Sequence, residues 1–190
     1  MKTVLLFIVF LVPFVLFCQS AKKEHDFRNA DWGMRPAQVI KSEKIKLSKG
    51  NNDLYGTTEV SGMPVIVLYS FTNDKLTSAS YLFEQKHTNQ NDYIDDYNRL
   101  KKFLSKKYGD PLTDIIDWSN ELYKDNYDAW GMAVGMGYLI FKSSWLNDKS
   151  SIALLLMGEN FKINMGITYI SLELDELRES AEEEEALEGL

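Results

Sequence analysis

The residue types best suited to chemistry gather in one stretch of the sequence, residues 110–130. Its acidic residues are Asp110, Asp114, Asp117, Glu121, Asp125 and Asp128, and its large aromatic residues are Trp118, Tyr123, Tyr127 and Trp130. A cleft lined by carboxylates and aromatic rings is typical of sugar-active sites. One hypothesis is therefore a carboxylate-dependent hydrolase or a glycan-binding protein that uses this loop. In the competing interpretation the acids are merely solvated, and the aromatic residues contact a ligand or partner without catalysis.

Other kinds of catalytic and cofactor chemistry lack the residues they need. Cys18 is the only cysteine, and His25 and His87 are the only histidines, with no second histidine at metal-binding spacing. A serine triad would need a histidine base, and no Gly-x-Ser-x-Gly sequence is present. The glycines of residues 131–137 lack the Lys-Ser/Thr ending of a phosphate-binding loop. We therefore predict no catalytic residue, no metal site and no cofactor, and a protein that is not an enzyme.

The net charge of −7 comes from the C-terminal end of the chain. Residues 171–190 contain nine acidic residues and one basic residue, whereas residues 21–170 contain 19 of each. A balanced body lacks the concentrated basic face that binds nucleic acid, so we predict no nucleic-acid partner. A block of like charge favours a solvated, frayed end. We expect residues 172–190 to form an acidic tail that is helical from about residue 175 to 186.

The first twenty residues have the layout of a secretory signal peptide. Lys2 precedes fourteen residues, 4–17, that carry no charged or hydrogen-bonding side chain, and the sequence turns polar after Ser20. Fourteen apolar residues are fewer than the about 20 that span a bilayer. Cleavage after Ser20 predicts an exported protein, periplasmic or secreted. The alternative is a lipid anchor at Cys18, and only in that case do we expect the membrane as a partner. Phe17 is larger than the residue expected before a lipidated cysteine.

The sequence predicts that the first half of the body, up to about residue 86, forms a short helix followed by strands. Pro36 suits the first position of a helix over residues 36–41. Strand-like segments follow at residues 54–60, 63–72 and 76–85. The two-residue turns Ser61-Gly62 and Asn73-Asp74 separate them, so the strands should pair antiparallel as a meander. Both alternating sets of residues 65–71 are apolar, which predicts a central strand covered on both faces.

Residues 91–108 give the strongest helix prediction in the chain. Asn91 can cap the start of this helix, and Gly109 can end it in the left-handed conformation. Spacings of three and four place Leu100 in the middle of one apolar stripe and Lys101 on the solvated face. The stripe consists of Tyr93, Ile94, Tyr97, Leu100, Phe103, Leu104 and Tyr108.

The second half of the body repeats the order of the first. A short apolar segment at residues 115–118 precedes residues 120–137, which we expect to be an irregular loop or a broken strand. Strands are then predicted at residues 138–146, 151–157 and 161–170, with turns at residues 147–148 and 158–160. In the last of these strands alternate residues are apolar, which is typical of a strand with one buried face.

This order predicts an α+β fold, with helices on one face of an antiparallel meander sheet. The matching order of the two halves indicates a degenerate tandem α-then-β repeat. The expected organisation is a signal peptide over residues 1–20, a single domain over residues 21–171 and the acidic tail. The two sub-repeats would cover about residues 27–86 and 91–171.

The chain resembles known proteins in the residues at the start of its body and in the order of its predicted helices and strands. Residues 27–34, Phe-Arg-Asn-Ala-Asp-Trp-Gly-Met, and the helix that follows resemble a group of small exported bacterial proteins of unassigned function. The plan of helix then meander, twice, is similar to folds of the β-lactamase-inhibitor-protein type and to the small outer-membrane assembly lipoproteins. The resemblance implies a non-catalytic protein that binds a protein or envelope component through its sheet face or loops. It assigns no interface residue, because only Trp32-Gly33-Met34 matches in residues.

Overall fold

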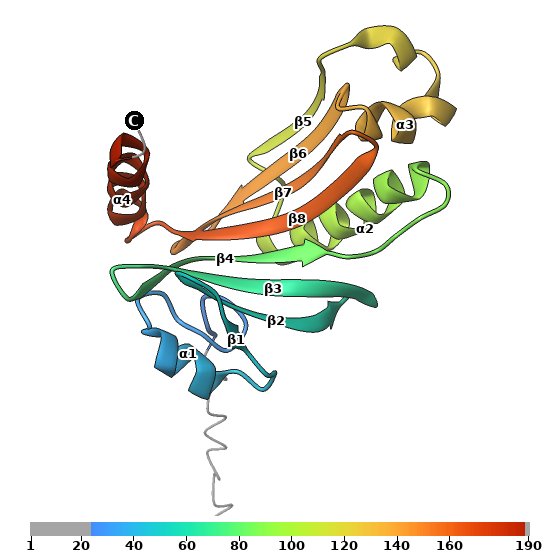
Figure 1. Ribbon diagram of the computed structural model, residues 1–190. Helices are drawn as coiled ribbons and strands as arrows, with labels where there is room; N and C mark the ends of the chain where they lie inside the picture. The colour runs from blue at the N-terminus through green and yellow to red at the C-terminus, as the bar shows by residue number, and fades with distance from the viewer. Residues whose placement is uncertain (1–23, 189–190) are drawn as a thin grey trace, which may run out of the picture.

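Figure 1 shows a computed structural model of the protein, which describes residues 24–188. The predicted signal peptide and Cys18 lie outside the described residues. The helices are α1 (Pro36–Ser42), α2 (Asn91–Tyr108), α3 (Trp130–Gly135) and α4 (Asp175–Glu188), with short 3-10 helices η1 (Glu121–Tyr123) and η2 (Tyr127–Ala129). The strands are β1 (Ser48–Lys49), β2 (Asp53–Val60), β3 (Met63–Thr72), β4 (Lys75–Phe83), β5 (Thr113–Trp118), β6 (Leu139–Leu146), β7 (Ser150–Glu159) and β8 (Lys162–Ser171). Within residues 24–188 no helix is long and apolar enough to cross a membrane.

All of these strands belong to one antiparallel sheet, in the order β1-β2-β3-β4-β8-β7-β6-β5. Each half of the chain contributes a meander that follows a helix, and the last strands of the two meanders, β4 and β8, pair at the centre (Figure 1). This arrangement confirms the α+β prediction and its antiparallel meander. The pairing of β4 with β8 joins residues that are far apart in sequence, such as Tyr81 and Ile167.

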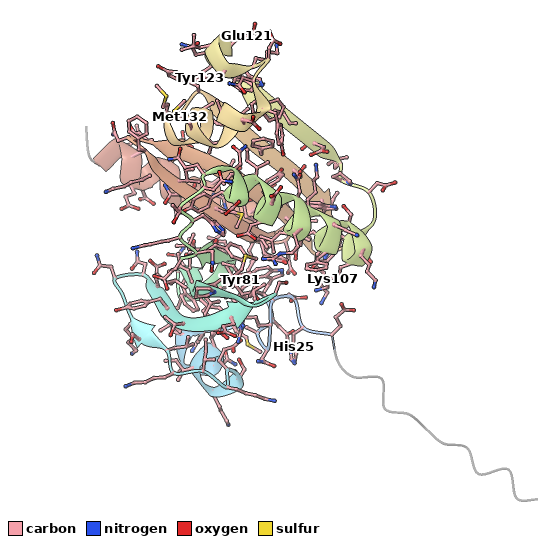
Figure 2. All side chains as sticks on the ribbon, turned by 90° about the vertical axis from the view of Figure 1, so that its right-hand side faces the viewer. His25, Tyr81, Lys107, Glu121, Tyr123 and Met132 are labelled. Carbon is pink, nitrogen blue, oxygen red and sulfur yellow. The ribbon has the colours of Figure 1, made fainter. Side chains whose placement is uncertain are left out.

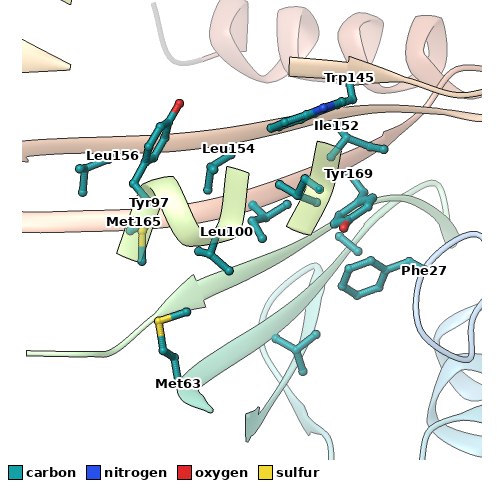
Figure 3. Close-up of a cluster of buried hydrophobic side chains, with 14 of the residues drawn as sticks. Phe27, Met63, Tyr97, Leu100, Trp145, Ile152, Leu154, Leu156, Met165 and Tyr169 are labelled. Carbon is teal, nitrogen blue, oxygen red and sulfur yellow. The ribbon is translucent and has the colours of Figure 1, made fainter. Parts of the chain in front are cut away.

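The sheet has one buried face, here called the inner face, and α2 and α3 pack against its second half. Val39 of α1 joins the same hydrophobic core below the first half. Figure 3 shows the packing of Leu100 and Tyr97 from α2 among Leu154, Leu156 and Met165 of β7 and β8. The opposite face, here called the outer face, carries the alternate residues of each strand and has no comparable cover; α4 lies over one end of it, near Ser70 and Ser78.

The bounds of α2 agree with the prediction, but its start is built differently. Gly109 ends the helix with a φ of +88°, as expected. Gln90, not Asn91, precedes the first turn, so the predicted cap is wrong. The Asn91 side chain instead accepts a hydrogen bond from the Gly131 amide at 2.6 Å and donates one to the Tyr127 carbonyl at 3.0 Å. Asn91 thereby ties the start of α2 to η2 and to the first turn of α3.

Residues 120–137 form short helices rather than the loop or broken strand that the sequence predicts. Gly131 of α3 lies against the start of α2, and a Cβ there would come within 2.2 Å of the Gln90 carbonyl carbon. Gly158 of β7 is similarly close to α3, because its Cβ would lie 2.3 Å from the Val134 carbonyl oxygen. The glycines therefore permit close backbone packing, and the β7–β8 turn falls at Asn160-Phe161 rather than at 158–160.

The C-terminal helix α4 lies beside β3, on the side of the sheet away from α1 (Figure 1). Its extent agrees with the expected helix in the tail. Arg178 forms ion pairs with Asp175 and Glu182 at 2.7 Å, both within the same helix. Such local pairs between partly exposed side chains contribute little to stability.

Truncation after Ser180 is therefore expected to change the free energy of unfolding by less than about 1 kcal/mol. The truncation removes side chains that are mostly exposed and deletes one of the Arg178 partners, Glu182. Urea unfolding of the full and truncated chains measures the difference. A loss of several kcal/mol would show that the end of α4 is an integral part of the fold.

Candidate functional site

The structure brings together three of the four aromatic residues predicted to contact a ligand. The ring centroids of Trp118 and Trp130 are 5.5 Å apart in an edge-to-face arrangement, and those of Tyr127 and Trp130 are 5.1 Å apart. The Trp130 indole donates a hydrogen bond to the Lys124 carbonyl at 3.0 Å. Trp118, Trp130 and Tyr123 are half-buried against the core, and Tyr127 is exposed. These aromatic rings largely pack on one another and on the body, at the end of the molecule where Figure 2 labels Tyr123.

The acidic residues of the same stretch are placed as solvated or structural groups. Asp114 accepts hydrogen bonds from the Ser143 hydroxyl at 2.7 Å and from Lys101 at 3.0 Å. Burial alone would raise the pKa of the Asp114 carboxyl, but these two donors outweigh it and hold the pKa below its usual value. A general acid in a glycosidase needs a raised pKa. The hydrolase hypothesis therefore gains no support from Asp114.

The Asp114 contact belongs to a chain of hydrogen bonds across the inner face. The buried Tyr97 hydroxyl of α2 lies 2.6 Å from the Ser143 hydroxyl of β6, which in turn donates to Asp114 of β5. Because the Ser143 hydroxyl donates its proton to Asp114, the Tyr97 hydroxyl is the donor to Ser143. Burial also raises the pKa of Tyr97 to about 12. These contacts fix β5 and β6 to α2, which is a structural role. Among the described residues, no group of three or more histidines, cysteines or acids is placed to hold a metal ion.

The outer face carries a row of side chains that the sequence prediction missed. Strand register places Ile66 of β3, Leu82 of β4 and Gly166 of β8 side by side, followed by Leu155 of β7. Continued outward, the same row reaches Lys142 of β6 and Ile115 of β5. The row thus crosses the sheet and is predominantly apolar.

A second row beside the first is rich in small and hydroxyl-bearing residues. It begins with the exposed ring of Tyr55 and with Leu68, and at the centre of the sheet Ser80 and Thr168 are joined by a hydrogen bond of 3.0 Å. Ala153 of β7 follows. In this row the paired central strands therefore present small side chains, and the larger apolar ones lie on the side of β2 and β3.

The sequence signal for the outer face was present but was interpreted wrongly. Both alternating sets of residues 65–71 are apolar, which predicted a strand covered on both faces. In the structure Ile66 and Leu68 are only half-buried, and neighbouring Leu82 keeps 43% of its surface exposed. The doubly apolar pattern marks an open apolar face, because α4, the helix on this side of the sheet, lies near Ser70 and Ser78 and leaves Ile66, Leu68 and Leu82 partly exposed.

The two larger of the open cavities found in the described residues lie away from this row. One of about 690 Å³ separates α4 from the ends of β2 and β3 and is lined by Ser70, Ser78, Arg178 and Glu182. The other, of about 490 Å³, lies at the N-terminal segment, where Figure 2 labels Tyr81, Lys107 and His25. Both are lined by side chains already paired within the protein, such as Arg178 with Glu182 and His25 with Asp31.

Because comparisons with known proteins find no match, the proposal of a function rests on the sequence and the geometry of the structure. No family model, no curated protein and no solved structure matches this chain. The resemblance drawn from residues 27–34 and from the repeated plan therefore stays a prediction.

Proposed function

We propose that this chain is a non-catalytic exported protein that binds another protein, an envelope component among the candidates, through the outer face of its sheet. The observation that carries the proposal is the apolar row Ile66-Leu82-Leu155, which crosses the central strands and is left uncovered. Exposed apolar side chains on a rigid sheet are typical of protein interaction sites. Export rests on the signal-peptide layout of residues 1–20.

The proposal is supported by where the polar groups of this face lie. Ser80 and Thr168 pair with each other, yet each hydroxyl retains capacity for a further hydrogen bond to a partner. Interfaces of this kind combine an apolar centre with a few oriented polar groups. The carboxylate alternative has no comparable support, because the Asp114 carboxyl is held in its ionised form by Ser143 and Lys101.

Leu82→Glu is expected to weaken binding of the partner by at least about tenfold, which corresponds to about 1.4 kcal/mol. The substitution places an unpaired charge in the centre of the apolar row, and it costs little stability because Leu82 is already exposed. Phe103→Glu is a matched control, since Phe103 is exposed to a similar degree but belongs to α2 on the other side of the sheet.

A photo-crosslinking residue at position 82, with position 103 as the control, identifies the partner in envelope extract. The identified protein is then purified and its affinity is measured by titration calorimetry against wild type, Leu82→Glu and Phe103→Glu. We expect a protein adduct from position 82 and loss of affinity in Leu82→Glu alone. Absence of an adduct at position 82, or equal effects of the two substitutions, would contradict the proposal.

A further inference from the structure

The free edge of the sheet at β5 is open for a further strand. Among residues 24–188, β5 is the last strand of the sheet on its side and pairs with β6 alone. Ile115 and Ile116 are 47% and 50% exposed and point to opposite faces of the sheet. An exposed edge strand with apolar side chains on both faces is a template for pairing with another chain.

The alternation of hydrogen bonds along β5 shows which of its backbone groups point away from β6, toward the free edge. The Ser119 amide donates to the Tyr138 carbonyl of the segment leading into β6, at 2.9 Å. Because alternate residues of an antiparallel strand face the partner, Asp117 and Ile115 also direct their backbone groups toward β6. The N–H and C=O groups of Asp114, Ile116 and Trp118 then point to the free edge.

The opposite edge of the sheet is protected and β5 is not. At that edge β1 comprises two residues, Ser48–Lys49, and Lys44 and Lys46 precede it. Short edge strands and lysines are devices that prevent edge-to-edge pairing. β5 has six residues and contains neither lysine nor proline.

The charge around β5 indicates what kind of strand it accepts. Residues 110–130 contain six acids and a single lysine, so this stretch is acidic within a body whose charges balance only as a whole. A second copy that paired its own β5 here would bring two acidic segments together, which is unfavourable. A basic strand would instead meet opposite charge on Asp117 and in the adjoining loop.

We propose that β5 accepts an extended segment of a partner protein, bearing lysine or arginine, as a ninth strand of the sheet. Backbone groups of Asp114, Ile116 and Trp118 pair with the segment, and the two isoleucines contact its side chains on either face. This inference rests on the proposed function, because it names a second contact and the chemistry of the protein bound. Strand addition of this kind obtains its affinity from main-chain hydrogen bonds.

The test uses the full chain and a short fluorescent peptide that alternates lysine and valine. Ile116→Pro removes an outward N–H without touching the bonds to β6, and proline is tolerated at such an edge position. Ile116→Ala is the matched control, because it removes the side chain and keeps the N–H. We expect Ile116→Pro to weaken peptide binding by at least about tenfold, with Ile116→Ala within about threefold of wild type.

A second measurement separates strand pairing from plain charge attraction and does not depend on the variant folding. The same peptide with every backbone amide N-methylated keeps its charge but loses its backbone donors, and it should bind wild type at least about tenfold more weakly. A peptide that alternates glutamate and valine should not bind. No binding of the lysine peptide, or equal binding of its N-methylated form, would overturn the proposal.

Two further outcomes bear on the choice of partner. Concentration-dependent self-association of the full chain that Ile116→Pro abolishes would assign the edge to a second copy and overturn the inference. If Leu82→Glu lowers the affinity for the crosslinked partner while Ile116→Pro leaves that affinity unchanged, the proposed function stands and the edge inference fails. Loss of that partner's affinity in Ile116→Pro, with Ile116→Ala unaffected, supports the inference.

Discussion

Leu100→Ala is expected to lower the free energy of unfolding by about 2–5 kcal/mol. Leu100 is 2% exposed, in the middle of α2, and its side chain packs among residues of the inner face (Figure 3). The substitution removes buried methyl groups and leaves a cavity between α2 and the sheet. Urea unfolding followed by tryptophan fluorescence measures the loss, which is a large part of the about 5–15 kcal/mol typical of a domain.

Lys102→Ala is the matched control for Leu100→Ala and should change stability by less than about 0.5 kcal/mol. Lys102 is exposed on the same helix. Lys101, which the sequence places on the solvated face, cannot serve, because it pairs with Asp114 at 3.0 Å and lies 5.8 Å from the Tyr97 ring centroid. Equal losses in Leu100→Ala and Lys102→Ala would contradict the packing of α2 on the inner face.

The elements that sequence predicted well are those defined by local chemistry. The turns at Ser61-Gly62 and Asn73-Asp74 adopt positive φ at both residues, as a two-residue hairpin loop of type I′ requires. The helix α2 follows from its apolar stripe and from Gly109. Within that stripe Phe103 is the exception, because it is 47% exposed at the border of the buried face.

The features that sequence could not predict depend on contacts between distant residues. Nothing in residues 130–135 distinguishes a helix from a loop until Gly131 meets Gln90 across the fold. The central pairing of β4 with β8, and therefore the continuity of the row from Ile66 to Leu155, is also non-local. For this reason the candidate site could be predicted only as a loop of acids and aromatic residues, and the open apolar face was taken for a buried one.

A buried ion pair fixes the N-terminal segment to the end of α1. The Glu43 side chain is fully buried and accepts hydrogen bonds from the Arg28 guanidinium at 3.3 Å. The backbone and side-chain amides of Asn29 donate to the same carboxylate at 3.2 and 3.3 Å. The hydroxyl of Tyr69, buried and without a hydrogen-bond partner of standard geometry, also faces it. Because Phe27 packs on Tyr69, Tyr81 and Tyr169, this pair also holds Phe27 at the junction of the two halves.

The surroundings of Glu43 keep its carboxyl ionised. Burial alone would raise the pKa of Glu43, but Tyr69, Arg28 and Asn29 together outweigh it and hold the pKa below its usual value. A carboxyl whose pKa is lower in the folded state contributes stability above its unfolded pKa of about 4.3. That contribution is lost as the pH falls through the lower, folded pKa.

Glu43→Gln is therefore expected to lower the free energy of unfolding at neutral pH by about 3 kcal/mol. Glutamine keeps the shape of the side chain but leaves the charge of Arg28 unpaired; the value is at the low end of the usual range because Arg28 retains some contact with water. As the pH falls below the unfolded pKa and through the lower, folded pKa of Glu43, wild type loses this advantage and the two unfolding curves should converge. Asp114→Asn is the control, since its pair with Lys101 is more exposed and should contribute less than about 1 kcal/mol. A difference between Glu43→Gln and wild type that stays constant from neutral to acidic pH would show that the glutamate acts through its shape and not through its charge.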